Sequence, residues 1–162
     1  MNYSEDLELA KQNEKEIRSV LQKVRKRKLK DVDAFFHKAH DEVFEEIDCL
    51  QCANCCKTTS PIFRDVDIKR ISKSLRMKDS QFIDAHLKMD DEGDYVLKSS
   101  PCHFLNEDNT CSIYETRPLA CRDYPHTDRR KMVQILKLTE KNASICPAVS
   151  RILIKLVKNP LL

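Results

Sequence analysis

The sequence has 162 residues, about the length of one domain, and its formal net charge of +3 is too mild to indicate a nucleic-acid partner by itself. Its single glycine, Gly93, argues against Gly-rich phosphate-binding loops and all-β architectures, because both need several residues with positive φ. Tryptophan is absent and only 6% of the residues are aromatic, so a platform for stacking nucleic-acid bases is not expected. The most informative feature of the composition is its eight cysteines.

The N-terminal part of the chain predicts two helical segments of opposite charge. Residues 4–30 contain no glycine or proline and have a loose helical spacing of apolar residues, and their second half, residues 18–30, is basic without any acidic residue. Residues 32–47 have an apolar face and, opposite it, an acidic face. We expect the two segments to pack antiparallel through these charges, in preference to a basic patch that binds nucleic acid or a membrane. We assign residues 1–30 to a charged helical extension and residues 31–162 to a cysteine-cluster metal-binding domain.

The elements after residue 48 are shorter. Apolar periodicity predicts helices over residues 65–75, 81–87, 118–121 and 147–158. Residues 129–138 fit a helix or a strand equally well. The turn Asp90–Asp94 precedes a short strand at residues 95–97, and residues 102–114 have the pattern of a small hairpin. We therefore predict an α+β fold, predominantly helical: one small domain with a Cys-rich, metal-nucleated irregular region and a short β-hairpin.

The N-terminus gives no indication of secretion, because residues 1–6 lack the basic and apolar regions of a signal peptide. No apolar run approaches the ~18 residues of a membrane span, so no span is expected. We therefore expect a cytoplasmic chain with reduced thiols, in preference to a secreted disulfide scaffold.

The cysteines form a tight run and a dispersed set. The run is Cys49-x2-Cys52-x2-Cys55-Cys56, and the dispersed set is Cys102, Cys111, Cys121 and Cys146. Two intervening residues let a turn of backbone aim two sulfurs at one ion, which is why C-x2-C recurs in zinc and iron–sulfur sites. The adjacent Cys55 and Cys56 cannot easily point the same way, so they belong to different sites or one of them is not a ligand. We predict a metal site and take all eight cysteines as candidate ligands, without assigning a catalytic residue.

Two cofactors, an iron–sulfur cluster and zinc, remain open. A three-Cys run with x2 spacing and a distant cysteine before proline, here Cys146-Pro147, is similar to ferredoxin ligation and slightly favours iron. Zinc sites often use two C-x2-C pairs, and only the N-terminal run supplies that spacing. Thiolate-only ligation suits both cofactors and disfavours magnesium or calcium. Within the run, we expect Cys52 and Cys55 to matter more than Cys56, because x2-spaced sulfurs can converge.

Two of the histidines are close to cysteines in the sequence. His103 follows Cys102 directly, and His126 lies five residues beyond Cys121, so either could complete a mixed site. The remaining ones, His37, His40 and His86, are distant from the cysteines. We treat all five as surface or supporting residues rather than ligands.

The cysteines and their neighbours together resemble a known family. The matching features are the run at residues 49–56, Pro101-Cys102-His103-Phe104-Leu105, the segment from Cys111 to Pro125, and Cys146-Pro147. They are similar to the cysteine-cluster family with a zinc- or iron-chelating CxxCxxCC domain, over residues 49–147. One departure is Ala53, where that family commonly has glycine. The resemblance implies metal binding through these cysteines and no particular reaction.

Three functions fit these features. We prefer a metal-binding protein in which the metal has a structural, sensor or carrier role and in which eight thiols close the coordination shell. The alternatives are a metal- or cluster-dependent enzyme of unknown reaction, for which no catalytic motif is visible, and a zinc-type nucleic-acid-binding module that uses residues 18–30. We do not expect nucleic acid as a partner, and a protein partner is left open.

Overall fold

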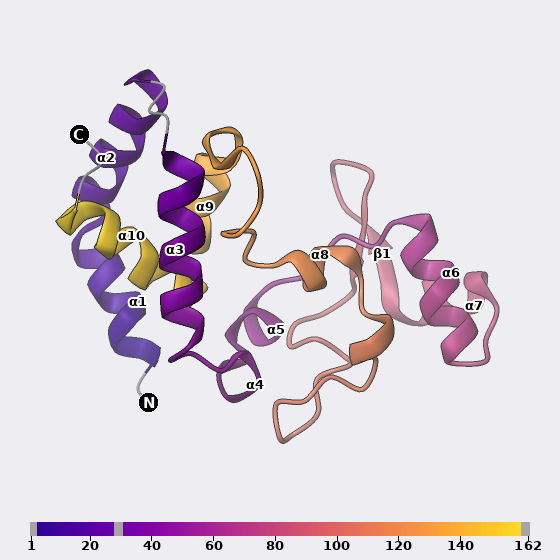
Figure 1. Ribbon diagram of the computed structural model, residues 1–162. Helices are drawn as coiled ribbons and strands as arrows, with labels where there is room; N and C mark the ends of the chain where they lie inside the picture. Colours follow the sequence, from indigo (N-terminus) through magenta and orange to yellow (C-terminus); the bar gives the residue numbers. More distant parts are fainter. Residues whose placement is uncertain (1–2, 28–30, 160–162) are drawn as a thin grey trace. The chain divides into compact units, whose positions relative to one another are not determined.

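The computed structural model describes residues 3–27 and 31–159, which fold into two compact units (Figure 1). Unit 1 takes its residues from the ranges 1–52 and 125–162, and unit 2 spans residues 53–124. Residues 28–30, at the end of the predicted basic segment, lie outside the described residues, as do the first two residues of the predicted extension. Helices predominate and two short strands form a hairpin, so the predicted helical α+β class is confirmed. Within the described ranges, no helix is both long and apolar enough to cross a membrane.

Unit 1 is built around its last helix. Its elements are α1 (Tyr3–Gln12), α2 (Glu14–Arg27), α3 (Val32–Phe44), α4 (Cys49–Cys52), the 3-10 helix η2 (Met132–Ile135), α9 (Leu136–Asn142) and α10 (Pro147–Lys158). Helix α10, yellow in Figure 1, packs against α1, α2, α3 and α9. It begins with Pro147, whose missing N–H costs nothing in a first turn, and Val149, Ile152 and Leu156 of its apolar face are fully buried. The predicted terminal helix is confirmed.

The charges of unit 1 pair differently from our expectation. On the acidic side of α3 and just beyond it, Glu42 accepts a hydrogen bond from Lys155 at 2.6 Å and Glu46 accepts one from Arg151 at 2.8 Å. The basic half of α2 instead provides Arg18, which pairs with Glu140 of α9 at 2.9 Å. Both α2 and α3 pack against the apolar face of α10. The cations that pair with the acidic side of α3 are therefore those of α10.

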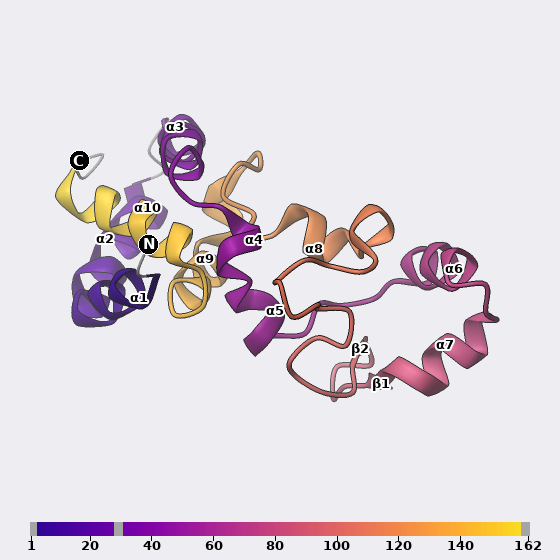
Figure 2. The same ribbon diagram turned by 90° about the horizontal axis from the view of Figure 1, so that it is seen from below.

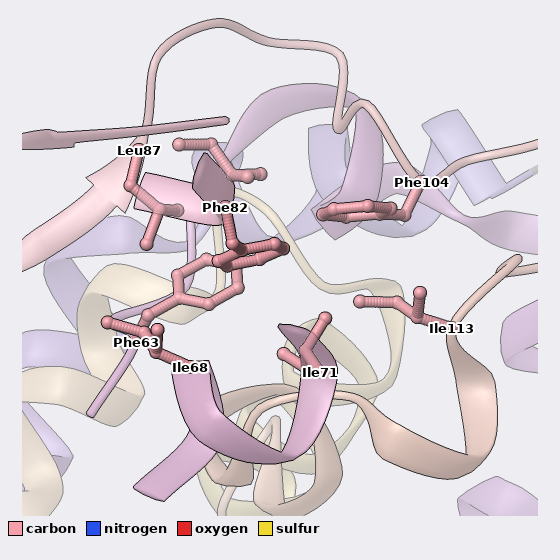
Figure 3. Close-up of a cluster of buried hydrophobic side chains, with 8 residues drawn as sticks. Phe63, Ile68, Ile71, Phe82, Leu87, Phe104 and Ile113 are labelled. Atoms are coloured by element: carbon pink, nitrogen blue, oxygen red, sulfur yellow. The ribbon is translucent and has the colours of Figure 1, made fainter. Parts of the chain in front are cut away.

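Unit 2 has a smaller apolar cluster, surrounded by short elements. These elements are α5 (Asn54–Thr58), α6 (Asp65–Ser74), α7 (Asp79–His86), β1 (Leu87–Met89), β2 (Tyr95–Leu97), the 3-10 helix η1 (Tyr114–Thr116) and α8 (Leu119–Asp123). The buried cluster consists of Phe63, Ile68, Ile71, Phe82, Leu87, Leu97, Phe104 and Ile113 (Figure 3). Strands β1 and β2 pair antiparallel, with Leu87 opposite Leu97, so two members of the cluster face each other across the hairpin. The turn between the strands uses the one glycine, Gly93, at φ 86°, as the sequence predicts for this segment.

Two local predictions need revision, and one segment that the sequence left open is assigned. Leu87 is not the end of a helix, because α7 stops at His86 and Leu87 extends to pair with Leu97. The hairpin expected at residues 102–114 is reduced to one bridge, between Leu105 and Cys111. Of the ambiguous segment at residues 129–138, residues 132–138 are helical, in η2 and the start of α9, and residues 129–131 are not.

Candidate metal centre

The eight cysteines divide between the two units. Cys49 and Cys52 lie on α4 of unit 1, and Cys146 immediately precedes α10 in the same unit. The cysteines of unit 2 are Cys55, Cys56, Cys102, Cys111 and Cys121. The C-x2-C-x2-CC run therefore contributes two thiols to each unit.

Backbone hydrogen bonds position three of the unit 2 cysteines. The N–H of Cys102 donates to the carbonyl of Cys56 at 2.7 Å, and the N–H of Leu105 donates to the carbonyl of Cys102 at 3.1 Å. Leu105 in turn forms the bridge with Cys111. The side chains of Cys102 and Cys111 also pack against the apolar cluster. Three cysteines that are far apart in the sequence thus lie on directly connected segments.

The fourth cysteine of this set, Cys121, lies on α8, whose first residue is held by a buried carboxylate. Asp67 of α6 has no exposed surface, and its Oδ1 accepts a hydrogen bond from the N–H of Leu119 at 3.3 Å. Two guanidinium groups compensate its charge: Arg64 donates to Oδ2 at 2.9 Å and Arg70 donates to Oδ1 at 2.7 Å. Burial raises the pKa of Asp67, but the hydrogen bonds from Arg64 and Arg70 outweigh it and lower the pKa to about 2.

Arg70 extends this network to the segment before α8. Its guanidinium donates to the carbonyls of Thr116 at 3.2 Å and of Arg117 at 2.8 Å, in addition to Asp67. Charged hydrogen bonds from α6 therefore hold the loop that leads into Cys121.

The thiols of unit 2 affect one another's ionisation. Burial, together with the charges of Cys56, Cys102 and Cys111, raises the pKa of Cys121 to about 12. Burial also raises the pKa values of Cys102 and Cys111, and the charge of Cys56 contributes to both. The pKa of Cys56, in contrast, is lowered to about 7, chiefly by a hydrogen bond from the thiol of Cys55. Four thiols are thus close enough to interact electrostatically, and a bound cation would favour the thiolate form of all four.

A second group of thiols lies in unit 1. Cys49 and Cys52 are three residues apart on α4 and so share one face of that helix. Burial raises the pKa of Cys146 to about 11, and the charges of Cys49 and Cys52 add to this effect. The backbone N–H groups of Ala148 and Val149 at the start of α10 act in the opposite direction. Cys146 therefore lies close enough to the first two cysteines of the run for their charges to affect its thiol, although they stand nearly one hundred residues earlier in the sequence.

The two groups supply the right donors without a finished coordination shell. None of the eight cysteines, all of which lie in the described ranges, forms a disulfide. Among the described residues, no three His, Cys, Asp or Glu side chains converge closely enough to ligate one ion as they are placed. Thiolates are the donors that zinc and iron–sulfur clusters take, so the residues present fit either cofactor in their chemistry.

The histidines serve mainly as packing and hydrogen-bonding groups. His37 Nε2 lies 2.9 Å from the carbonyl oxygen of Arg129, and His40 Nδ1 lies 2.8 Å from the hydroxyl of the buried Thr127. The ring of His103 lies 4.6 Å from that of His86, measured between centroids. His126 has a left-handed backbone with φ 65°.

Asp67 is the residue of this site that the sequence analysis does not single out. A signal for it exists, because arginines stand three residues before it and three residues after it, where they share its helix face. The spacing of the cysteines does not predict their division between two units either, since that division depends on which loops are hydrogen-bonded together.

Thiol groups gathered on short, hydrogen-bonded segments are typical of the metal-chelating class of domains. The family model described as "CxxCxxCC: Putative zinc- or iron-chelating domain" matches residues 48–147. This match covers more than half of the chain, and the chain belongs to the CxxCxxCC family. No curated protein and no solved structure matches the chain.

Proposed function

We propose that the protein chelates zinc or an iron–sulfur cluster through its eight cysteines and that the metal has a structural, sensor or carrier role rather than a catalytic one. The observation that supports this proposal best is that backbone hydrogen bonds and a single β-bridge connect the segments of Cys56, Cys102 and Cys111, with Cys121 on α8 of the same unit. Four thiolates are a complete tetrahedral shell for zinc and the usual ligand set of an iron–sulfur cluster. We assign this chemistry to the cytoplasm, where thiols stay reduced.

We further propose that the cysteines act as two groups, one in each unit. The unit 2 group is the set of four just named together with Cys55, and the unit 1 group is Cys49, Cys52 and Cys146. Cys55 hydrogen-bonds to Cys56 within unit 2. This grouping argues against the expectation that Cys56 matters less than Cys52 and Cys55, because its charge acts on three other thiols.

Metal analysis of the full chain and its eight single Cys→Ser variants tests the proposal. The protein is purified without oxygen and assayed for zinc, iron and acid-labile sulfide, which separates the two cofactors in one measurement. We expect Cys56→Ser and Cys121→Ser to lose the same share of metal, and Cys49→Ser and Cys146→Ser to lose a different share. If every variant kept the wild-type metal content, the cysteines would be ordinary thiols and the proposal would fail.

The division into an extension at residues 1–30 and a metal domain at residues 31–162 also remains a proposal. A chain that begins at Asp31 is expected to retain metal, because the removed residues include no cysteine or histidine. It is also expected to be less stable, because α1 and α2 pack against α10. Complete loss of metal from a folded truncated chain would contradict the division.

A further inference from the structure

The C-terminal half of α2 keeps its positive charge in the folded protein. The acidic residues of α3 that were expected to pair with it instead pair with α10. Arg18, near the start of α2, is neutralised by Glu14 and Glu140. In the part of the chain that the structure describes, the three cations after it form no ion pair, and all three are exposed: Lys23, Arg25 and Lys26.

A second basic segment is held against the start of α3. It precedes η2, and its three residues are exposed and form no ion pair across residues 3–27 and 31–159: Arg129, Arg130 and Lys131. The backbone N–H groups of residues 131 and 132 donate to the carboxylate of Asp33 at 2.6 and 2.8 Å. His37 Nε2 lies 2.9 Å from the carbonyl oxygen of Arg129. Figure 2 shows this loop, in orange, beside α3.

The two basic segments belong to one end of unit 1. Helix α2 ends at Arg27 and α3 begins at Val32, so about 18 Å of chain at most separates the end of one helix from the start of the other. The basic loop is bonded to the first turn of that second helix through Asp33. Six cations from positions about one hundred residues apart in the sequence therefore gather at this end.

The charge at this end is unbalanced. Three carboxylates stand beside the two segments in the sequence, on Asp31, Asp33 and Asp128, against the six cations. Both oxygens of Asp33 already accept backbone hydrogen bonds. Glu16 of α2 lies two turns before Lys23, about 10 Å away along the helix axis. The excess of three positive charges equals the formal net charge of the whole chain.

The residue types at this end fit a phosphate backbone better than a protein or a membrane. The exposed residues of positions 19–26 are the three cations with Ser19 and Gln22, and all five are side chains that hydrogen-bond to phosphates. The apolar residues of the same stretch, such as Leu21 and Val24, are buried. A protein interface needs an apolar core, and a helix that lies in a membrane surface needs an exposed apolar face. A protein–DNA interface needs neither, because it is polar and strongly positive.

We propose that this end of unit 1 binds the phosphate backbone of double-stranded DNA, independently of base sequence. The basic residues of α2 and of the loop contact phosphates, and neither segment has an aromatic side chain on which single-stranded bases could stack. Duplex DNA is favoured over duplex RNA, because its major groove admits a helix whereas that of RNA is deep and narrow. The proposal departs from the expectation that nucleic acid is not a partner, which depended on α2 pairing with α3. It uses no cysteine, so it stands or falls separately from metal binding.

The probe for the test is a fluorescein-labelled DNA duplex of mixed sequence, titrated with the full-length protein and followed by anisotropy. We expect saturable binding at about 50 mM salt that weakens steeply towards 200 mM, since counterions are released from the DNA. Six phosphate contacts give a slope of about −5 in log K against log salt. The single strand, the RNA duplex of the same sequence and vesicles containing phosphatidylserine should each bind at least several-fold more weakly.

Three triple variants that remove the same charge separate this surface from general attraction. The first two change the basic residues of α2 (Lys23→Gln, Arg25→Gln, Lys26→Gln) and those of the loop (Arg129→Gln, Arg130→Gln, Lys131→Gln). Each should weaken DNA binding at least tenfold at low salt and reduce the salt slope by about 3, one for each lost phosphate contact. The control changes exposed lysines of unit 2 (Lys69→Gln, Lys73→Gln, Lys88→Gln) and should bind nearly like the wild type.

The changed side chains of all three variants are exposed, and circular dichroism checks that each variant folds. The proposal is overturned if the DNA duplex does not bind at low salt. It is also overturned if duplex RNA or the vesicles bind as tightly as DNA, or if the unit 2 control loses as much affinity as the other two variants.

Discussion

Unit 1 and unit 2 are stabilised by different means. Unit 1 places four helices around α10, whose apolar face is fully buried, as residues such as Ile152 and Leu156 show. Unit 2 has one cluster of eight apolar residues, and Cys102 and Cys111 lie on segments with little regular structure beside it. Apolar periodicity is thus a sufficient account of unit 1, whereas the cysteine-bearing loops of unit 2 need a further source of stability. Under the proposed function, metal coordination would be that source.

Removing the metal should produce the largest difference in stability between the two units. Apparent binding energies of structural zinc in small peptides are about 10–16 kcal/mol, which equals or exceeds the stability of a typical domain. After an added chelator has removed the metal, we expect amide protection to be lost over residues 98–124 while α10 keeps most of its protection. Hydrogen exchange followed by mass spectrometry measures both regions in one sample. Equal loss in both, or none in either, would show that metal does not account for the difference.

Truncating a buried apolar side chain in each unit should show how far each unit depends on its own core. Phe82 and Ile152 are both fully buried, one in each unit, and their replacement by alanine should cost about 3–5 and 2–5 kcal/mol, respectively. We expect Phe82→Ala to lower protection in unit 2 and Ile152→Ala to lower it in unit 1. Metal-loaded and metal-free samples of both variants are compared by the same exchange experiment. If either truncation lowered protection equally in both units, the two cores would not be independent.

Asp67 should contribute less, but with a distinctive dependence on pH. Its pKa is lowered from an ordinary value of 3.8 to about 2, so the folded state favours the ionised form by about 2 kcal/mol. This stabilisation is fully present above pH 4 and is lost as the pH falls through about 2. Asp67→Asn should therefore destabilise α6 by about 2 kcal/mol at pH 6 and by little at pH 2.

Urea unfolding of the metal-free proteins at both pH values, followed by exchange in α6, checks this result. Metal-free samples are needed because acid also displaces metal from thiolates. Asp84, an exposed residue of α7 outside this network, provides the matched variant Asp84→Asn. A pH-independent effect of Asp67→Asn would show that the pairing of its charge with Arg64 and Arg70 is not what stabilises α6.

The smallest expected effect is that of an ion pair in unit 1. Arg151 donates to Asp6 and to Glu46, both at 2.8 Å, and a quarter of its side chain is exposed. Arg151→Met keeps most of the apolar stem and should cost about 1 kcal/mol, because ion pairs of this exposure contribute little. Thermal unfolding at low and high salt measures it, and the difference from wild type should shrink as salt is added. A loss as large as that of Ile152→Ala would mean that unit 1 depends on charge as much as on its core.

The sequence predicts unit 1 more completely than unit 2, for a physical reason. The helix at residues 147–158 follows from Pro147 and an apolar repeat of helical period, and both signals are local. Its partners are less predictable: opposite charges on neighbouring segments suggest that those segments pair, yet Glu42 pairs with Lys155. Which helices meet depends on the shared apolar face of α10, and that face does not show in charge patterns.

In unit 2 the sequence identifies the chemistry but not the grouping. The candidate ligands are evident from spacing, and the family match over residues 48–147 supports metal binding. The proposed grouping of Cys56 with Cys102 and Cys121 depends on one backbone hydrogen bond and on α8, and no spacing rule encodes either. The ligand set itself is still to be tested by metal analysis.

The discontinuity of unit 1 has a consequence for the order of events during protein synthesis. All of unit 2 is contiguous, so its four coupled thiols are complete as soon as residue 124 has left the ribosome. Unit 1 must wait for α10, because the helices of residues 3–44 have no apolar partner of comparable size before residues 147–158 are made. The nascent chain therefore meets its surroundings with Cys49 and Cys52 still lacking Cys146. We expect unit 2 to mature first and the N-terminal helices to be the part that needs protection from aggregation until α10 has been made.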